Sequence, residues 1–243
     1  MNHVVNHVVN HHTEYFDLGL IDYKEAWDRQ TELFNKILAV KSENRNRPET
    51  DQLLTNNFLL FCEHPHVYTL GKSGDENNLL IKKEELSTIG ATYYHINRGG
   101  DITYHGPGQL VVYPVVDLEN FFTDIHQYMR LLEEAVIQTL QEYKIESGRI
   151  ARLTGVWLDP EHKTKARKIC AMGVKTSRWV TLHGLALNVN TDLTYFNHMV
   201  PCGITDKAVT SLDKELGRSV DMNELKMILK EKITHLFRME IVN

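Results

Sequence analysis

Three strand-like segments in close succession limit the fold of this 243-residue chain more than any other feature. Residues 155–158 and 168–175 are apolar or alternating, and the polar stretch 159–167 between them is typical of a hairpin with a long, charged tip. Residues 181–189 alternate in the same way and are expected to pair with these strands. Strands joined by hairpins build antiparallel sheets, so we expect hairpins to dominate over βαβ units.

Capping signals predict three helices. Asp22, Asp124 and Asp221 are each followed three residues later by Glu or Gln, which is capping-box spacing. Apolar residues recur at helical intervals after each aspartate, and the first helix should cover residues 23–40. Residues 41–52 are polar and contain Pro48, which predicts a loop. We also expect a short helix at residues 82–88, ended by Gly90, and strands at 58–62, 91–96 and 110–116.

Helices at both ends and in the middle of a strand-rich chain predict an α+β fold. We expect a mixed, largely antiparallel central sheet flanked by helices. The length allows one sizeable core and no linker divides the sequence, so residues 13–243 are predicted to form a single domain. Residues 1–12 contain a tandem repeat and four histidines, and we expect them to be a disordered terminus outside the fold.

Charge and cysteine content narrow the class of protein. The net charge is −5, and no dense run of Lys and Arg suggests a nucleic-acid interface. No apolar run approaches the length of a membrane span, and the N-terminus lacks the pattern of a secretory signal. Three widely spaced cysteines argue against a disulfide framework and for a reducing compartment. We therefore expect a cytoplasmic protein that binds neither nucleic acid nor membrane.

Residues 98–109 form a glycine-rich segment that leads into the expected strand at 110–116. The segment contains four glycines and one proline, which indicates a backbone that lies close to another strand or to a ligand. A glycine-rich hairpin is the alternative explanation, and the segment alone does not decide between the two.

The three cysteines have different surroundings. Cys202 lies between Pro201 and Gly203, which suits an irregular loop where a substrate carbonyl can approach the sulfur, whereas the alternative for any lone cysteine is a small buried apolar residue. Cys170 falls in an alternating strand and is interpreted as packing. Cys62, His64 and His66 also alternate, but no second ligand cluster is evident, so we expect a shaped turn there and no metal site.

Seven ordered blocks between residues 63 and 216 together resemble one family. They are EHPHVYTLG, RGGDITYHGPGQLVVYP, TGVW, KICAMG, HGLALNVN, PCG and TSL. The chain resembles the lipoyl(octanoyl) transferase family, whose members move an octanoyl group from acyl carrier protein to a lysine of lipoyl domains. This resemblance implies the fold of the lipoate and biotin protein ligase catalytic domains, with a tunnel for an acyl chain.

The resemblance also implies roles for individual residues. Cys202 is the expected nucleophile, which carries the acyl group as a thioester, and Lys168 is the expected residue that tunes it. No cofactor and no metal are implied. The expected partners are octanoyl-acyl carrier protein as donor, and lipoyl domains of 2-oxoacid dehydrogenase-type complexes and glycine cleavage H protein as acceptors. The expected substrate-binding residues are Arg98, Gly99, Gly100, Asp101, Ile102, Thr103, Tyr104, His105, Ala171, Met172, Gly173, Gly184, Leu185 and Ala186.

Two other functions compete with this interpretation. An ATP-dependent lipoate ligase of the same fold needs no cysteine, whereas this chain has Cys202 in its PCG block. A non-catalytic scaffold that holds acyl carriers or lipoyl domains predicts that Cys202→Ser leaves partner binding intact. The chain also departs from the family pattern at Ala171 and Met172, where serine and leucine are common, and Met172 is the position expected to alter the preferred acyl length.

Overall fold

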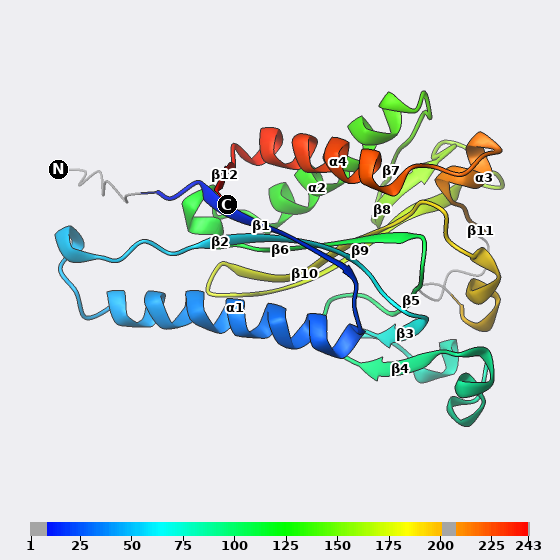
Figure 1. Ribbon diagram of the computed structural model, residues 1–243, viewed down its shortest axis with the longest axis horizontal. Helices are drawn as coiled ribbons and strands as arrows, with labels where there is room; N and C mark the ends of the chain where they lie inside the picture. The colour runs from blue at the N-terminus through cyan, green and yellow to red at the C-terminus, as the bar shows by residue number, and fades with distance from the viewer. Residues whose placement is uncertain (1–8, 201–207, 243) are drawn as a thin grey trace.

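A nine-stranded mixed sheet forms the centre of the computed structural model, which describes residues 9–200 and 208–242 (Figure 1). The strand order is β12-β1-β2-β6-β10-β9-β8-β7, and β11 pairs with β9 beside this path. The strands are β1 (His12–Leu20), β2 (Asn57–Glu63), β6 (Gln109–Val115), β7 (Gly148–Ile150), β8 (Leu153–Leu158), β9 (Arg167–Ser177), β10 (Val180–Asn188), β11 (Ala208–Val209) and β12 (Glu240–Val242).

The pairing is mostly antiparallel. β8, β9 and β10 are antiparallel neighbours, and β10 continues antiparallel to β6, which in turn pairs with β2. Parallel pairs occur where β1 meets β2 and β12, and where β11 meets β9. The predicted hairpin of residues 155–158 and 168–175, its pairing with residues 181–189, and the mixed, largely antiparallel sheet are confirmed.

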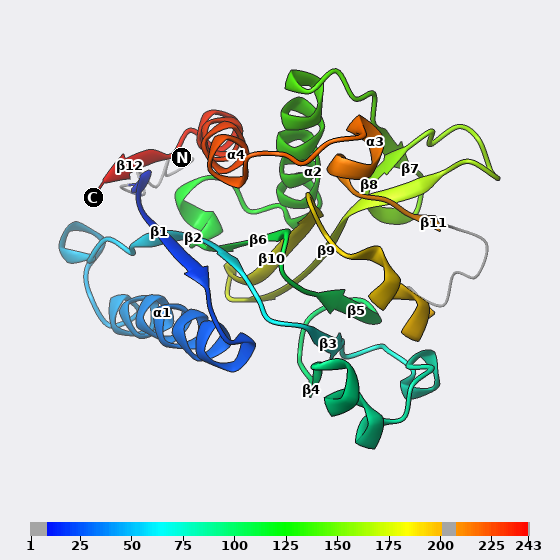
Figure 2. The same cartoon turned by 45° about the vertical axis from the view of Figure 1, so that its right-hand side comes forward.

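A second sheet of three strands lies beside the N-terminal end of α1 (Figure 2). β3 (Val67–Leu70) is its central strand, parallel to β4 (Thr92–His95) and antiparallel to β5 (Ile102–His105). β4 is the strand predicted at residues 91–96. β5 carries part of the glycine-rich segment, so this small sheet presents that segment to the central sheet.

The three predicted long helices are present, and each begins at its predicted aspartate. Asp22 caps α1 (Tyr23–Asn44), Asp124 caps α2 (Ile125–Glu142) and Asp221 caps α4 (Met222–Phe237), each through side-chain bonds to two backbone N–H groups of the first turn. A further short helix is α3 (Leu212–Leu216). The helix α1 runs four residues beyond its predicted end because Lys41 in its last turn pairs with buried Asp117.

Short 3-10 turns connect these elements. The predicted helix at residues 82–88 is the 3-10 helix η3 (Lys83–Ile89), and Gly90 ends it at a positive φ of 65°. The others are η1 (Glu49–Asp51), η2 (Glu76–Asn78), η4 (Leu118–Asn120) and η5 (Leu193–His198).

The helix α1 lies on one side of the central sheet, and α2 and α4 lie on the other (Figure 2). Alternate residues of the central strands form one core on each side. Leu59 and Phe61 of β2 point toward α2 and α4, where Leu132, Leu140, Leu229 and Ile233 complete the larger core. Phe58, Leu60 and Cys62 point toward α1 and pack against Leu33, Phe34 and Ile37. Cys62 is therefore a packing residue of the smaller core.

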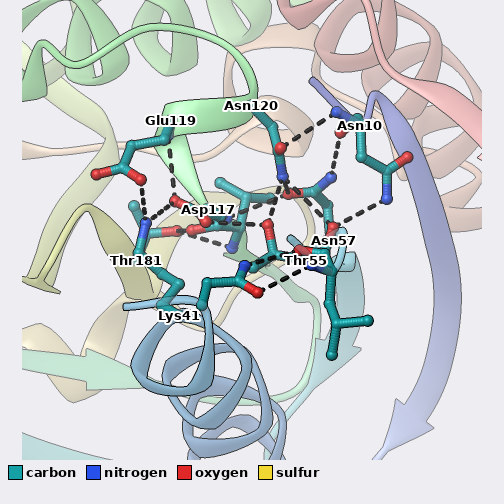
Figure 3. A network of polar contacts seen from close by, with 11 residues as sticks. Asn10, Lys41, Thr55, Asn57, Asp117, Glu119, Asn120 and Thr181 are labelled. Atoms are coloured by element: carbon teal, nitrogen blue, oxygen red, sulfur yellow. Dashed lines mark hydrogen bonds and ion pairs between the residues drawn. The ribbon is translucent and has the colours of Figure 1, made fainter. Parts of the chain in front are cut away.

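A polar network closes the end of the sheet that follows β6 (Figure 3). The Asp117 carboxylate accepts hydrogen bonds from Lys41 Nζ at 2.6 Å, Thr55 Oγ1 at 2.9 Å and the Glu119 backbone N–H at 3.2 Å. The Asp117 backbone N–H donates to Asn57 Oδ1 at 3.1 Å. This network ties the last turn of α1 to β2 and to the end of β6.

The fold extends further toward the N-terminus than predicted. Asn10 donates through Nδ2 to the Thr55 carbonyl, and His12 opens β1 opposite Glu240. Residues 10–12 therefore belong to the ordered structure and correct the predicted boundary at residue 13. Among the described helices, none combines the length and the apolar character that crossing a bilayer requires.

Candidate active site

A cavity of about 570 Å³ lies between β9, β10, β6 and the glycine-rich segment. A cavity of this size is typical of a site for a small-molecule ligand. Its wall contains most of the residues predicted for the substrate site together with Lys168. These are Arg98, Gly99, Gly100, Asp101, Ile102, Thr103, His105, Lys168, Ala171, Met172, Gly173, Gly184, Leu185 and Ala186.

The glycine-rich segment lies directly on β9. The Gly99 backbone N–H donates to the Val174 carbonyl at 3.0 Å, and a Cβ atom at Gly173 would lie 2.7 Å from the Gly99 carbonyl oxygen. Arg98 fixes the start of the segment, because Nη2 donates to the Thr69 carbonyl and Nη1 donates to the Gly99 carbonyl. Of the two explanations for these glycines, the close approach to another strand is therefore correct.

Lys168 enters the cavity wall from β9 beside the bulged strand β8. Its Nζ lies 4.6 Å from the centre of the Trp157 ring, a distance at which an ammonium and an aromatic face attract each other. Gly155 of β8 has a φ of +118°, and a Cβ there would lie 2.5 Å from the Cys170 carbonyl oxygen and 3.6 Å from Lys168 Cε. The buried Glu133 carboxylate accepts the Gly155 backbone N–H at 3.0 Å, which holds this glycine beside the lysine stem.

Cys202 lies outside the described residues, so the structure does not test its predicted role or its distance from Lys168. The chain on both sides is described. The Val200 backbone N–H donates to the Asn78 carbonyl at 2.8 Å, and Val209 in β11 pairs with Lys168 in β9. The described chain therefore resumes at β11, beside Arg167 and Lys168 of β9.

Three buried histidines lie in or behind the cavity wall, and burial keeps all three neutral near pH 7. Loss of solvation lowers the pKa of His105 to about 3 and that of His183 to about 3, and nearby positive charge on Arg98 acts in the same direction on both. Burial also lowers the pKa of His64 to about 4, although its hydrogen bond to the Ile21 carbonyl opposes the shift. The site thus contains uncharged imidazoles.

His183 is the most unusual of these histidines. It is 2% exposed, lies in the wall of the cavity and has a φ of +66°, a left-handed conformation that non-glycine residues rarely adopt in a strand. Its ring atom Nε2 is buried without a hydrogen-bond partner among the described residues, while its backbone N–H donates to Gln30 Oε1 at 3.1 Å. Strained residues of this kind occur mainly at functional sites.

Tyr104 is the predicted site residue that the structure does not bring to the cavity. Its side chain is buried against Tyr195 and Phe196, with ring centroids 5.1 and 5.2 Å away, and its hydroxyl bonds to His66 Nδ1 at 2.7 Å. Successive strand residues face opposite sides, so Thr103 reaches the cavity wall and Tyr104 supports the small sheet from behind.

Sequence comparison identifies the family of this fold. The profile of the lipoyl protein ligase A/B catalytic domain matches residues 22–234. The chain belongs to this family. An octanoyltransferase of Cytophaga hutchinsonii is 60% identical over 93% of this chain and 93% of its own length. An octanoyltransferase of Flavobacterium johnsoniae is 61% identical over 93% of this chain and 97% of its own length.

Solved structures support the same fold. A bipartite lipoate protein ligase of Thermoplasma acidophilum superimposes with a TM-score of 0.62, covering 96% of this chain and 88% of the other, at 18% identity. The predicted α+β fold of the lipoate ligase catalytic domain is therefore confirmed. The predicted membership of the lipoyl(octanoyl) transferase family is confirmed by the two relatives, and with it the class of enzyme, an acyltransferase.

Several cavity residues of this family member were not predicted. Tyr113 lies in the RGGDITYHGPGQLVVYP block, but alternation within the predicted strand at 110–116 does not indicate that it faces a ligand. Tyr23 opens a helix far away in the sequence, and His183 was assigned to a plain strand. The unpredicted lining residues are Tyr23, Ser73, Val111, Tyr113, Met129, Arg152, Leu153, Thr154, Val174 and His183.

The remaining cysteine and histidine candidates have structural contacts. Cys170 is fully buried in the larger core, as predicted for a packing residue, and burial raises the pKa of its thiol. His64 bonds through Nδ1 to the Ile21 carbonyl and through Nε2 to the Tyr113 hydroxyl, each at 2.8 Å. Within residues 9–200 and 208–242, no group of three His, Cys, Asp or Glu side chains is arranged to hold a metal ion.

Proposed function

We propose that this chain transfers an octanoyl group from acyl carrier protein to a lysine of lipoyl domains and of glycine cleavage H protein, through a thioester on Cys202. The observation that carries the proposal is a largely apolar cavity with Lys168 in its wall. Support comes from relatives that are 60% and 61% identical over 93% of the chain and bear the name octanoyltransferase.

The first half-reaction moves the acyl group onto the enzyme. Lys168 accepts the proton of the Cys202 thiol, and a neighbouring ammonium favours the resulting thiolate. The thiolate attacks the carbonyl carbon of the carrier's thioester, and the bond from that carbon to the carrier's sulfur breaks. The leaving sulfur takes the proton from Lys168, which leaves Lys168 neutral. One thioester replaces another, so the step needs no nucleotide.

The second half-reaction moves the acyl group to the acceptor. The neutral amine of the incoming lysine attacks the carbonyl carbon of the Cys202 thioester, and Lys168 accepts a proton from the amine. The bond between that carbon and the Cys202 sulfur breaks, and the sulfur regains its proton through Lys168. The product is an amide, which is more stable than a thioester, so the overall transfer runs downhill.

The cavity wall suits an acyl chain and its carbonyl group. Val111, Ala171, Met172, Leu185 and Ala186 contribute apolar surface for a saturated chain. The glycine-rich segment brings backbone close to the cavity. The Gly99 N–H is already bonded to the Val174 carbonyl, so we assign the backbone N–H groups of Arg98, Gly100 and residues 171–173 as candidate donors to the oxyanion of the tetrahedral intermediates. Cys62 and Cys170 are both free thiols, and a reducing compartment such as the cytoplasm is the proposed location.

A transfer assay without nucleotide tests this proposal. Purified enzyme is mixed with octanoyl-acyl carrier protein and a lipoyl domain, with and without ATP and Mg²⁺, and the mass of the lipoyl domain is followed. We expect one octanoyl group per lipoyl domain at the same rate in both mixtures, and no transfer by Cys202→Ser. An absolute requirement for ATP would favour a lipoate ligase, and binding of both partners without transfer would favour a scaffold.

A further inference from the structure

A continuous chain of hydrogen bonds joins the strand of Lys168 to His105 across three strands. The Lys168 carbonyl accepts from the Thr210 backbone N–H at 2.9 Å, and the Thr210 carbonyl accepts from Asn188 Nδ2 at 3.0 Å. Asn188 Oδ1 accepts from Gln109 Nε2 at 2.9 Å, and Gln109 Oε1 lies 2.7 Å from His105 Nδ1. Asn188, Gln109 and His105 are all buried, so water does not compete for these bonds.

The Thr210 carbonyl fixes the direction of the side-chain hydrogen bonds in this series. A backbone carbonyl only accepts, so the amide nitrogen of Asn188 must face Thr210 and its oxygen must face Gln109. Gln109 Nε2 also donates to the Tyr104 carbonyl at 3.1 Å, which independently fixes the orientation of this amide. Gln109 Oε1 therefore faces His105, and His105 Nδ1 must carry the hydrogen.

The opposite ring nitrogen of His105 is left with a lone pair. Burial lowers the pKa of His105 to about 3, so the ring carries one hydrogen near pH 7, and that hydrogen is on Nδ1. His105 lies in the cavity wall, and Nε2 makes no hydrogen bond with the residues that the structure describes. The cavity thus contains a nitrogen that accepts a hydrogen bond and does not donate one.

A second series of hydrogen bonds fixes the orientation of the Tyr113 hydroxyl, which also lies in the cavity wall. His64 Nδ1 donates to the Ile21 carbonyl, so neutral His64 accepts at Nε2 from the Tyr113 hydroxyl. Burial raises the pKa of Tyr113, so the hydroxyl keeps its proton and directs it at His64. The ring of His64 lies 5.9 Å from that of His105. Tyr113 therefore directs its hydroxyl proton away from the cavity, and His64 is uncharged.

We propose that His105 is a catalytic residue of the second half-reaction, in which Nε2 accepts a hydrogen bond from the amine of the incoming lysine and orients its lone pair toward the thioester carbon. This inference rests on the proposed function. His105 takes no proton, because its hydrogen bond only positions the amine while Lys168 receives the proton that the amine loses.

The chemistry of the substrates selects the amine as the bound group. An octanoyl chain has no hydrogen-bond donor. A thioester carbonyl and its oxyanion both accept hydrogen bonds, so the lone pair on His105 Nε2 repels each of them. The amine is a donor. Arg98, which lies in the same wall and lowers the pKa of His105 further, disfavours a second positive charge there. The site therefore suits the neutral amine, which is the reactive form.

Separate measurement of the two half-reactions tests this proposal. Enzyme is loaded with octanoyl-acyl carrier protein, freed of the carrier and mixed with a lipoyl domain, so that loading and transfer rates are obtained independently. We expect His105→Leu to load within about twofold of the unaltered enzyme and to transfer about tenfold more slowly, the size of effect of one hydrogen bond. His105→Gln, which keeps one acceptor oxygen, should recover part of the transfer rate.

The outcomes separate this inference from the proposed function. Failure of the unaltered enzyme to load would overturn the proposed function and this inference with it. Normal transfer by His105→Leu, or equal losses in loading and transfer, would overturn the role of His105 alone. Nitrogen NMR of the histidine rings, assigned with His105→Gln, adds a test that needs no turnover. We expect the Nδ1–H form of His105 at pH 7, and the Nε2–H form would contradict the proposal.

Discussion

Two buried polar clusters lie at opposite ends of β6, and they differ in whether their hydrogen bonds are complete. Beyond the C-terminal end, the Asp117 carboxylate receives donors from Lys41, Thr55 and Glu119 (Figure 3). At the N-terminal end, Gln109 bonds to His105, whose Nε2 faces the cavity without a bond to the described residues. One cluster is closed on itself, and the other is open toward a ligand.

The difference indicates what each cluster contributes. A buried polar group costs free energy unless it is bonded, so a complete network such as that of Asp117 serves to hold α1, β2 and β6 together. An acceptor left open in a cavity costs stability in the free protein and is compensated only when a ligand donates to it. The open cluster is therefore the place to look for binding and catalysis.

The largest expected effect separates the clusters by stability. Asp117→Ala leaves Lys41, whose side chain is only 11% exposed, without its buried partner, and should lower the free energy of unfolding by about 3 kcal/mol. Glu119→Ala is the matched control, because it removes the 45% exposed partner of the same lysine and should cost less than about 1 kcal/mol. Urea unfolding measures both. Equal losses would contradict the assignment of Asp117 as the structural centre.

Acid should destabilise the fold through the imidazoles around the cavity. The pKa of His64 is lowered to about 4 and those of His105 and His183 to about 3, whereas an unfolded histidine has a pKa of about 6.5. Between these values the unfolded chain binds more protons than the folded chain. The contribution of the neutral histidines to the free energy of unfolding is therefore complete above about pH 6.5 and is lost as pH falls toward 4. Each histidine then contributes a slope of about 1.4 kcal/mol per pH unit.

Urea unfolding at pH 7.5 and pH 5.5 measures this slope. His105→Gln removes one of the titrating groups, so we expect its stability to depend less steeply on pH than that of the unaltered protein. Identical free energies of unfolding at the two pH values would show that these rings are not held neutral. The assignment of His105 Nε2 as a hydrogen-bond acceptor would then be wrong.

The smallest expected effect concerns the apolar part of the cavity. Met172→Ala enlarges the wall beside β10, so we expect the preference for octanoyl over decanoyl carriers to fall by up to about tenfold in loading. Met227→Ala, which changes a 63% exposed methionine on α4, is the matched control and should leave the preference unchanged. An unchanged preference in Met172→Ala would place the end of the acyl chain elsewhere in the cavity.

Local features of this fold were predictable from the sequence, because their causes lie within a few residues. The aspartate caps of the three long helices and the hairpin of β8 and β9 depend on neighbouring side chains and alternation. The parallel pairing of β1 with β12 joins the two ends of the chain, and the small sheet joins strands far apart in sequence. No local pattern specifies such contacts, and they were missed.

The candidate site shows the same limit. The family resemblance named the glycine-rich segment and Lys168, which meet in the cavity wall. The hydrogen bonds that fix the His105 tautomer run through Thr210, Asn188 and Gln109, which are far apart in sequence. Tyr104 was assigned to the site with its neighbours, although strand alternation turns it to the opposite side. Cys202 lies outside the described residues, and its role stays a prediction.

Intact-mass spectrometry of the enzyme after incubation with octanoyl-acyl carrier protein tests the central claim most directly. We predict that the enzyme gains the mass of one octanoyl group, that hydroxylamine removes it, that Cys202→Ala gains nothing, and that Lys168→Met loads at least about a hundredfold more slowly. An octanoyl adduct that persists in Cys202→Ala, or transfer to a lipoyl domain without any adduct, would contradict the account.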